Sequence, residues 1–151
     1  MDLRLLSAVA VCGLMSAIPA LATPPVIVEA PSCAHRKLDT VEIEAGSRVS
    51  EGTIDRMPTA VSYRLAFNRL AEVAQEKGAN AVVLRGHRAT YFTRDGRRSK
   101  QAVHVQLRGA AILIEGDPAD CAMKLVSPRD YATRHDDPRI VETPSTQAYD
   151  D

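Results

Sequence analysis

The fold is decided by residues 58–114, which read PTAVSYRLAFNRLAEVAQEKGANAVVLRGHRATYFTRDGRRSKQAVHVQLRGAAILI. In the first part of this stretch, apolar residues recur every three or four positions, as on one face of an α-helix. Pro58 suits the first turn, where a missing N–H costs nothing, and Gly78 suits the position just past the helix end. The spacing therefore predicts one amphipathic helix between these two residues. Its predicted apolar face consists of Tyr63, Ala66, Phe67, Leu70, Val73 and Ala74.

Past residue 80, apolar residues recur at every second position, which is typical of β-strands. Asp95-Gly96 indicates a two-residue hairpin turn, because a type I′ turn needs positive φ at both central positions. A turn centred there would pair Leu84 with Leu107 on the returning strand. In that register the apolar residues of both strands lie on one face, where the helix can cover them.

A further strand is predicted before the helix, because apolar and polar residues alternate over 38–45. The predicted fold class is therefore α+β, with one amphipathic helix packed on a small, mainly antiparallel sheet that contains a long β-hairpin. Residues 23–37 are interpreted as a lead-in and 38–126 as a single domain, with a short edge strand or turn over 119–126. Residues 127–151 contain prolines and acids without an apolar period, so we expect a mostly disordered acidic tail.

Residues 1–22 have the features of a secretion signal. Arg4 precedes a long apolar run that ends in Ala20-Leu21-Ala22, a small-x-small cleavage pattern. The alternative is a membrane anchor, but Pro19 within the run and the cleavage pattern favour removal. We therefore expect a cleaved signal peptide, a periplasmic location and no stable membrane anchor after cleavage.

Cleavage would remove Cys12 and leave two cysteines, Cys33 and Cys121. Cys12 lacks the small preceding residue that lipid attachment favours, so no lipid anchor is expected. An even number of cysteines in an exported protein predicts a disulfide, which here would tie the start of the domain to its end. The alternative is a redox-active or metal-binding thiol pair, which the absence of Cys-x-x-Cys spacing makes the weaker hypothesis.

The predicted hairpin is basic, although the whole chain has a formal net charge of zero. That overall neutrality gives no reason to expect nucleic-acid binding. One interpretation of the basic hairpin is a solvated strand face balanced by the acidic tail. The other is a surface for an anionic envelope polymer, lipopolysaccharide or an acidic protein partner. The candidate anion-binding residues are Arg85, Arg94, Arg97, Arg98, Lys100 and Arg108.

His87 and His104 face each other in the predicted register, so their imidazoles could share a metal or respond to pH. Two ligands do not complete a zinc site, and solvent-facing histidines without a special role are the alternative. No triad, paired carboxylate, phosphate loop or dinucleotide pattern is present. We therefore expect a protein that is not an enzyme and has no cofactor.

Three blocks of sequence carry a resemblance to a known family: Lys77-Gly78-Ala79-Asn80-Ala81-Val82-Val83-Leu84, Lys100-Gln101-Ala102-Val103 and Gly109-Ala110-Ala111-Ile112-Leu113. The chain here resembles the Rcs stress-sensor (RcsF-like) lipoproteins and YbjQ-like small domains of the Gram-negative envelope. The resemblance implies a compact α+β domain and a non-catalytic envelope role in stress sensing or protein binding. It also aligns the two cysteines of the sensor's cross-strand disulfide with His87 and His104.

Two functional hypotheses follow. The first is a non-enzymatic periplasmic binding or sensor-like domain that recognises an envelope protein partner. The alternative is a metal- or anionic-polymer-binding module that uses His87 and His104 or the basic hairpin.

Overall fold

The computed structural model describes residues 23–46, 58–94, 97–133 and 140–145. The predicted signal peptide and the two central residues of the predicted hairpin turn lie outside these ranges. None of the helices in the described ranges has the length and apolar character needed to span a bilayer.

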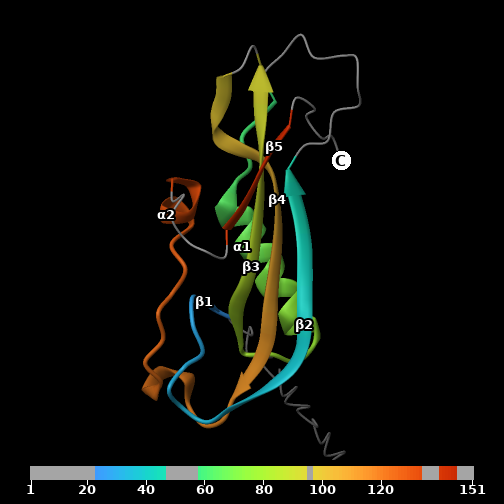
Figure 1. The fold of residues 1–151 in the computed structure, drawn as a ribbon. Helices are drawn as coiled ribbons and strands as arrows, with labels where there is room; N and C mark the ends of the chain where they lie inside the picture. Colours follow the sequence, from blue (N-terminus) through green and yellow to red (C-terminus); the bar gives the residue numbers. More distant parts are fainter. Residues whose placement is uncertain (1–22, 47–57, 95–96, 134–139, 146–151) are drawn as a thin grey trace, which may run out of the picture.

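A helix packs against one face of a mixed sheet (Figure 1), which confirms the predicted α+β class. The strand order is β1-β3-β4-β2, and β5 pairs with the same edge of β3 as β1 does, further along that strand. Pairings of β3 with β4 and of β4 with β2 are antiparallel, whereas β1 and β5 run parallel to β3. The elements are β1 (Val26–Ile27), β2 (His35–Gly46), α1 (Tyr63–Glu76), β3 (Ala81–Arg94), β4 (Arg97–Ile114), η1 (Pro118–Asp120), α2 (Pro128–Thr133) and β5 (Ile140–Ser145).

The helix α1 begins later than predicted. Its N-cap is Ser62, whose hydroxyl oxygen accepts a hydrogen bond from the backbone N–H of Leu65 at 3.5 Å. A serine hydroxyl at this position satisfies one of the backbone donors that a helix start leaves without a partner. Pro58 therefore lies outside the helix, and the prediction that it occupies the first turn was wrong.

The end of α1 agrees with the prediction. Gly78 has a φ of 78°, a backbone conformation that residues with a Cβ rarely adopt. Its N–H donates to the carbonyl of Gln75 at 2.8 Å, and the N–H of Ala79 donates to the carbonyl of Ala74 at 3.1 Å. These two bonds form a Schellman motif, which turns the chain directly into β3.

The pairing of β3 with β4 follows the predicted register only at the end of the hairpin. There, Arg94 pairs with Arg97. Irregularities around Tyr91 then place extra residues in β4, and another between Leu84 and Gly86 places an extra residue in β3. Because of these bulges the predicted pairs Leu84–Leu107 and His87–His104 were wrong. The observed pairs are Leu84–Gly109, His87–Leu107 and Thr90–His104.

The bulge in β3 also changes which side chains face the helix. Arg85 is the extra residue, so the alternation of the strand shifts by one position there. His87 consequently contacts Tyr63 of α1, and Ala89 and Tyr91 join the core on the helix side. A strict alternation counted from Val82 and Leu84 would place these three residues on the opposite face.

The main core lies between α1 and the sheet. Leu84 and Leu107 both belong to this core, together with Phe67 and Leu70 of α1. The prediction that the helix covers the apolar side of the hairpin is therefore confirmed, although the pairing that produces it differs. A second, smaller core lies on the opposite face, and its buried residues are Ile27, Ala81, Val83, Ala110, Ile112, Ile114 and Cys121.

The domain extends beyond both predicted boundaries. Within the predicted lead-in, Val26 of β1 pairs with Val82 of β3, and β2 already begins at His35. Within 119–126 the chain leaves η1 and then forms one isolated antiparallel bridge, between Leu125 and Ile27, so this segment lies along β1 without forming a regular strand.

The prediction of a mostly disordered tail over 127–151 was wrong for two segments. Residues of α2 form a helix because Tyr131 is an apolar anchor, only 3% exposed, whose ring lies edge-on to Phe67 at a centroid distance of 5.4 Å. Residues of β5 form a strand because they extend the sheet alongside β3, from Ile140 opposite His87 to Ser145 opposite Phe92. Neither segment has an apolar period of its own, so the local sequence pattern did not reveal them.

Candidate binding site

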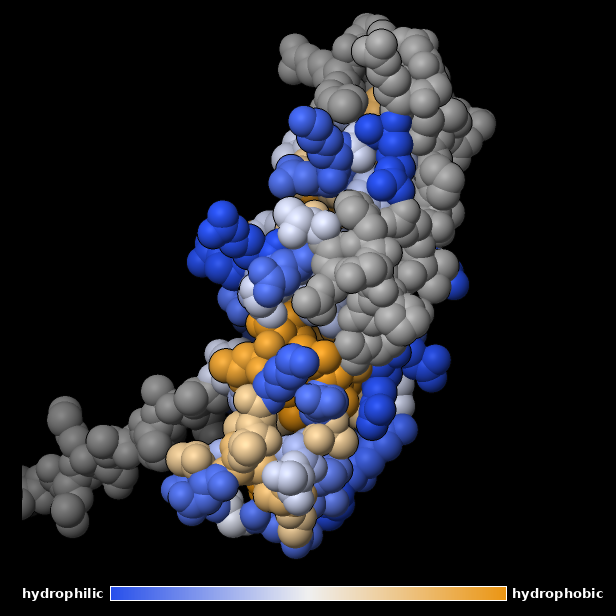
Figure 2. Space-filling model, turned by 60° about the vertical axis from the view of Figure 1, so that its left-hand side comes forward, coloured by the Kyte–Doolittle hydropathy of each residue, from blue (hydrophilic) through white to orange (hydrophobic). Residues whose placement is uncertain are grey.

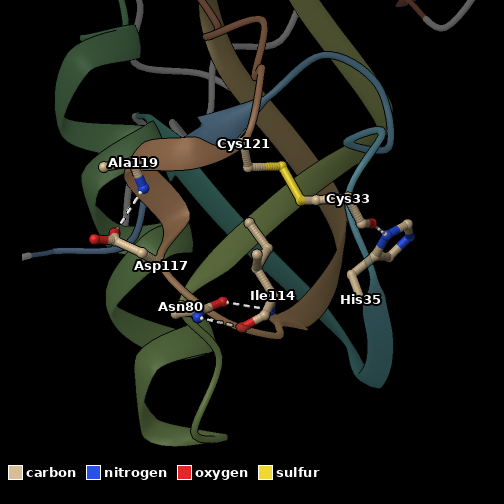
Figure 3. Close-up of a disulfide and its surroundings, with 7 residues drawn as sticks. All are labelled: Cys33, His35, Asn80, Ile114, Asp117, Ala119 and Cys121. Atoms are coloured by element: carbon tan, nitrogen blue, oxygen red, sulfur yellow. Dashed lines mark hydrogen bonds between the residues drawn. A yellow bond between two sulfur atoms is a disulfide. The ribbon is translucent and has the colours of Figure 1, made fainter.

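A disulfide joins Cys33 and Cys121 (Figure 3), as predicted from the sequence. Their Cα atoms are 5.7 Å apart, and the two residues are separated by 88 positions in the chain. The bond holds the segment before β2 against the segment after η1, and Cys121 belongs to the second core, against which Met123 packs. Since both sulfurs are bonded to each other, the alternative of a metal-binding thiol pair is not supported in this state.

The second core covers one end of the sheet face opposite α1, while the other end of that face carries exposed charged side chains. We call this region the open face. It is formed by side chains of β2, β3 and β4. Its exposed members are Lys37, Thr40, Glu42, Arg85, Arg88 and Arg108, and its half-buried members are Glu44 and Gln106.

The strand register arranges the open face in rows that cross the sheet. In one row, Glu44, Gln106 and Arg88 stand side by side on three neighbouring strands. A guanidinium N–H of Arg88 donates to Oε1 of Gln106 at 3.4 Å, and Nε2 of Gln106 donates to a carboxylate oxygen of Glu44 at 2.5 Å. These bonds hold the three side chains in place across the sheet.

The neighbouring row contains Glu42, Arg108 and Gly86, with the bulge residue Arg85 beside them. A depression of about 330 Å³ opens here and is lined by side chains of both rows. A second depression of about 330 Å³ shares Arg85, Gly86 and Arg108 with the first and is also lined by Lys37 and Thr40. The arginines therefore stand between two adjoining hollows.

The predicted basic surface is divided by the structure. Arg85 and Arg108 lie on the open face, where Arg88 joins them. Arg98 instead stacks on the ring of Tyr91, with its guanidinium carbon 4.4 Å from the ring centroid. Lys100 is exposed on the hairpin. Arg94 and Arg97 are register partners at the hairpin end, and their side chains lie outside the described structure.

The two histidines do not share a site. His87 is 3% exposed on the helix side, where its Nε2 lies 2.8 Å from the hydroxyl of Tyr63. His104 lies on the opposite side of the sheet, with Nε2 3.7 Å from a carboxylate oxygen of Glu44. The predicted metal or pH pair was thus wrong, because the bulges move the two rings to different faces. In the part of the chain that the structure describes, no three histidine, cysteine or acidic residues are grouped as metal ligands.

An apolar groove is a separate feature of the surface. It lies on the side of the molecule that carries β1 and α2, where apolar residues gather (Figure 2). Its volume is about 220 Å³, and Leu125 at its edge is 62% exposed. The groove contains few polar groups, so the open face is the richer site for specific recognition.

Sequence reasoning missed Glu42, Arg88 and Gln106 as members of one site. The signal for Glu42 was present, because polar residues alternate along the predicted strand over 38–45. Nothing in the local pattern indicated that these side chains meet, since they come from three strands whose register depends on bulges.

Comparisons of the chain with protein-family models, characterised proteins and solved structures found no match. The class of protein is defined by its fold and its site: it is a small, disulfide-linked α+β domain with a charged, solvent-exposed sheet face.

Proposed function

We propose that this protein is a non-enzymatic binding or sensor-like domain of the bacterial envelope that recognises a protein partner. The observation that carries the proposal is the open face, where exposed side chains of both charges stand in rows across three paired strands. A disulfide supports the extracytoplasmic part of the proposal, because such bonds persist in oxidising compartments. A role in envelope stress sensing, as the resemblance to the Rcs sensor implies, belongs to the same proposal.

The charges of the open face indicate the kind of partner. The basic residues Lys37, Arg85, Arg88 and Arg108 outnumber the acidic residues Glu42 and Glu44. A protein segment rich in acids, with a few bases placed opposite the glutamates, would be complementary to this pattern. Complementary charge raises the rate of association and excludes partners of the wrong pattern.

The second candidate function is an anion-binding module, and one observation favours it. Arg85, Arg88 and Arg108 line the same depression. The metal version of that candidate has no such support, because His87 and His104 lie on different faces.

Site-specific photo-crosslinking in bacterial cells tests the protein partner. A photoreactive residue is placed at Arg88 on the open face or at Glu72, an exposed residue of α1, as the matched control. We expect one cross-linked protein from position 88 and none from position 72. Equal products from both positions would contradict the proposal.

A second variant makes the test specific. Arg108→Glu reverses one charge beside position 88, and it should reduce the yield of the cross-link while circular dichroism remains unchanged. An unaffected yield would show that the charges of the open face do not select the partner.

Cell fractionation tests the proposed location. We expect the protein in the periplasmic fraction, with Thr23 as its first residue when the N-terminus is sequenced. A cytoplasmic protein that retains Met1 would exclude the envelope role.

A further inference from the structure

The bulge in β3 creates an unusual arrangement of two arginines. Arg85 is the extra residue between the pairs Leu84–Gly109 and Gly86–Arg108. Two consecutive positions of β3 therefore stand opposite the single residue Arg108, and both arginines line the two hollows of the open face. A bulge can re-aim a side chain in this way without interrupting the sheet on either side.

Neither guanidinium is already engaged by an acid. Among the described residues, Arg85 and Arg108 make no ion pair, even though Glu42 is the register partner of Arg108. Arg88 is held in place through its bond to Gln106. The donors of Arg85 and Arg108 are thus available on an exposed surface.

The space between the arginines is kept open by a glycine. A Cβ added at Gly86 would lie 3.5 Å from Cβ of Arg108, which is ordinary contact, so a larger side chain would begin to fill the depression. The volume of each hollow, about 330 Å³, is at the lower end of the range for small-molecule sites. Each hollow is therefore large enough for a small phosphorylated group.

The chemistry of the lining selects the kind of group. A guanidinium presents a planar fork of N–H donors that matches the oxygens of a phosphate, and two such forks can hold one doubly charged oxyanion. Glu42 and the hydroxyl of Thr40 flank the arginines and can accept hydrogen bonds from hydroxyl groups. The carboxylate of Glu42 would repel a second phosphate nearby, which disfavours a continuous polyanion.

We propose that Arg85 and Arg108, which stand at the border of the two hollows, bind the phosphate monoester of a small polyol or sugar. This inference deepens the second candidate function, the anion-binding module, and rests on it. It is independent of the proposed protein partner, whose absence in the cross-linking experiment would leave the phosphate site untouched. Two sources share this chemistry: a free phosphorylated polyol and a phosphorylated lipid headgroup.

Isothermal titration calorimetry of the mature protein, residues 23–151, tests the site in phosphate-free buffer at physiological salt. The probes are glycerol 3-phosphate, inorganic phosphate and uncharged glycerol. We expect glycerol 3-phosphate to bind more tightly than inorganic phosphate, and glycerol to give no heat. Absence of heat from both phosphate probes at millimolar concentration would overturn the proposal for a free ligand, and the vesicle experiment below would then decide it.

Matched variants distinguish a built site from general surface charge. Arg108→Gln should weaken binding of glycerol 3-phosphate by about tenfold, the loss expected for one charge-assisted hydrogen bond. Arg64→Gln removes the same charge from the exposed side of α1 and should leave binding unchanged. Equal losses in both variants would mean that only net charge attracts the anion, and the proposal would fail.

Gly86→Val tests whether the anion occupies the space beside Gly86, because it blocks this space without removing either arginine. The added side chain should fill the hollow and abolish binding, while the thermal melt shows whether the domain remains folded. Undiminished binding by a folded Gly86→Val variant would place the anion elsewhere.

Sedimentation with lipid vesicles separates the two sources. One set of vesicles contains a phosphatidylglycerol whose glycerol headgroup carries a terminal phosphate monoester. Retention of the protein on these vesicles, but not on vesicles of phosphatidylglycerol or phosphatidylcholine alone, would support a lipid headgroup. Binding of soluble glycerol 3-phosphate without retention would support a free ligand. If neither occurs, the proposal is wrong.

Discussion

The side-chain amide of Asn80 forms two hydrogen bonds with the backbone of Ile114, the last residue of β4 (Figure 3). Nδ2 donates to the carbonyl oxygen of Ile114 at 3.0 Å, and Oδ1 accepts from its N–H at 2.7 Å. The backbone N–H of Asn80 also donates to the carbonyl of Ile112 at 3.1 Å. Asn80 therefore joins the start of β3 to the end of β4, directly after the helix.

Asn80→Asp should destabilise the protein by about 1–3 kcal/mol, because the carboxylate keeps the bond from the N–H of Ile114 but cannot donate to its carbonyl. Urea unfolding followed by circular dichroism measures the change. Asn68→Asp, at an exposed position of α1, is the matched control and should change stability by less than about 0.5 kcal/mol. Equal effects of the two substitutions would show that the bonds to Ile114 do not matter.

Removal of the disulfide should have a large effect. The double variant Cys33→Ser/Cys121→Ser should lose roughly 4 kcal/mol, because the bond closes a loop of 88 residues in sequence separation and restricts the unfolded chain. The measurement is urea unfolding of the variant beside the oxidised wild type. Wild-type protein in reductant should show a similar loss of stability. A urea unfolding curve that does not change when reductant is added would contradict the prediction.

Gly109 and Gly86 provide a matched pair of glycine substitutions on neighbouring strands. A Cβ at Gly109 would lie 2.6 Å from Cγ1 of Val82 and 3.6 Å from Cδ2 of Leu70, so Gly109→Ala forces the core beneath α1 to move. Overpacking of this kind costs about 1–3 kcal/mol. Gly86→Ala meets only ordinary contact, so a thermal melt should show a clearly smaller loss. The reverse order would refute the packing argument.

Gly78→Ala tests the backbone conformation at the end of α1. Among the described residues, apart from Gly78 itself and its two chain neighbours, no atom lies within 4 Å of a Cβ built there, so the expected cost comes from the φ of 78°. We expect a loss of about 1 kcal/mol in chemical denaturation, because a Cβ strains a left-handed conformation. Gly78→Asn should cost less, since asparagine tolerates this conformation better than alanine. An alanine variant as stable as the wild type would refute the prediction.

Asp39 should contribute to the pH dependence of stability. The backbone N–H of Thr40 donates to its carboxylate at 2.8 Å and, with Lys77 3.5 Å away, holds the pKa of Asp39 below its ordinary value of 3.8. A lowered pKa in the folded state stabilises the protein above pH 3.8, and this contribution is lost as the pH falls through the folded pKa. An NMR titration of the carboxyl carbon measures the shift.

The Asp39→Asn variant checks the sign of this effect. Its stability should fall below that of the wild type at neutral pH, and the difference should shrink as the wild-type carboxylate is protonated. Because the carboxylate is exposed, the difference should also be smaller at high salt. A difference that grows in acid would contradict the assignment.

The sequence pattern predicted the helix face, the end of the helix at Gly78 and the partner of Cys33, because each depends on local spacing or on a simple count. It did not predict the burial of His87. That residue is polar and stands at a position that strict alternation assigns to the face opposite α1. The extra residue Arg85 reverses the facing of the positions that follow it, so His87 lies beneath α1 and is buried. The contacts with Tyr63 and Tyr131 then enclose its ring.

The sequence by itself therefore determined the helix α1 and the long strands β2, β3 and β4, since their apolar periods repeat along neighbouring residues. Only the tertiary structure decided where the bulges shift the strand register. The register in turn decides which charged side chains meet on the open face. The physical reason is that the strand register depends on the packing of the core beneath α1, which buries Ala89 and Tyr91 beyond the bulge. That packing joins residues as distant as Ile43, Leu70 and Leu107, which no local period connects.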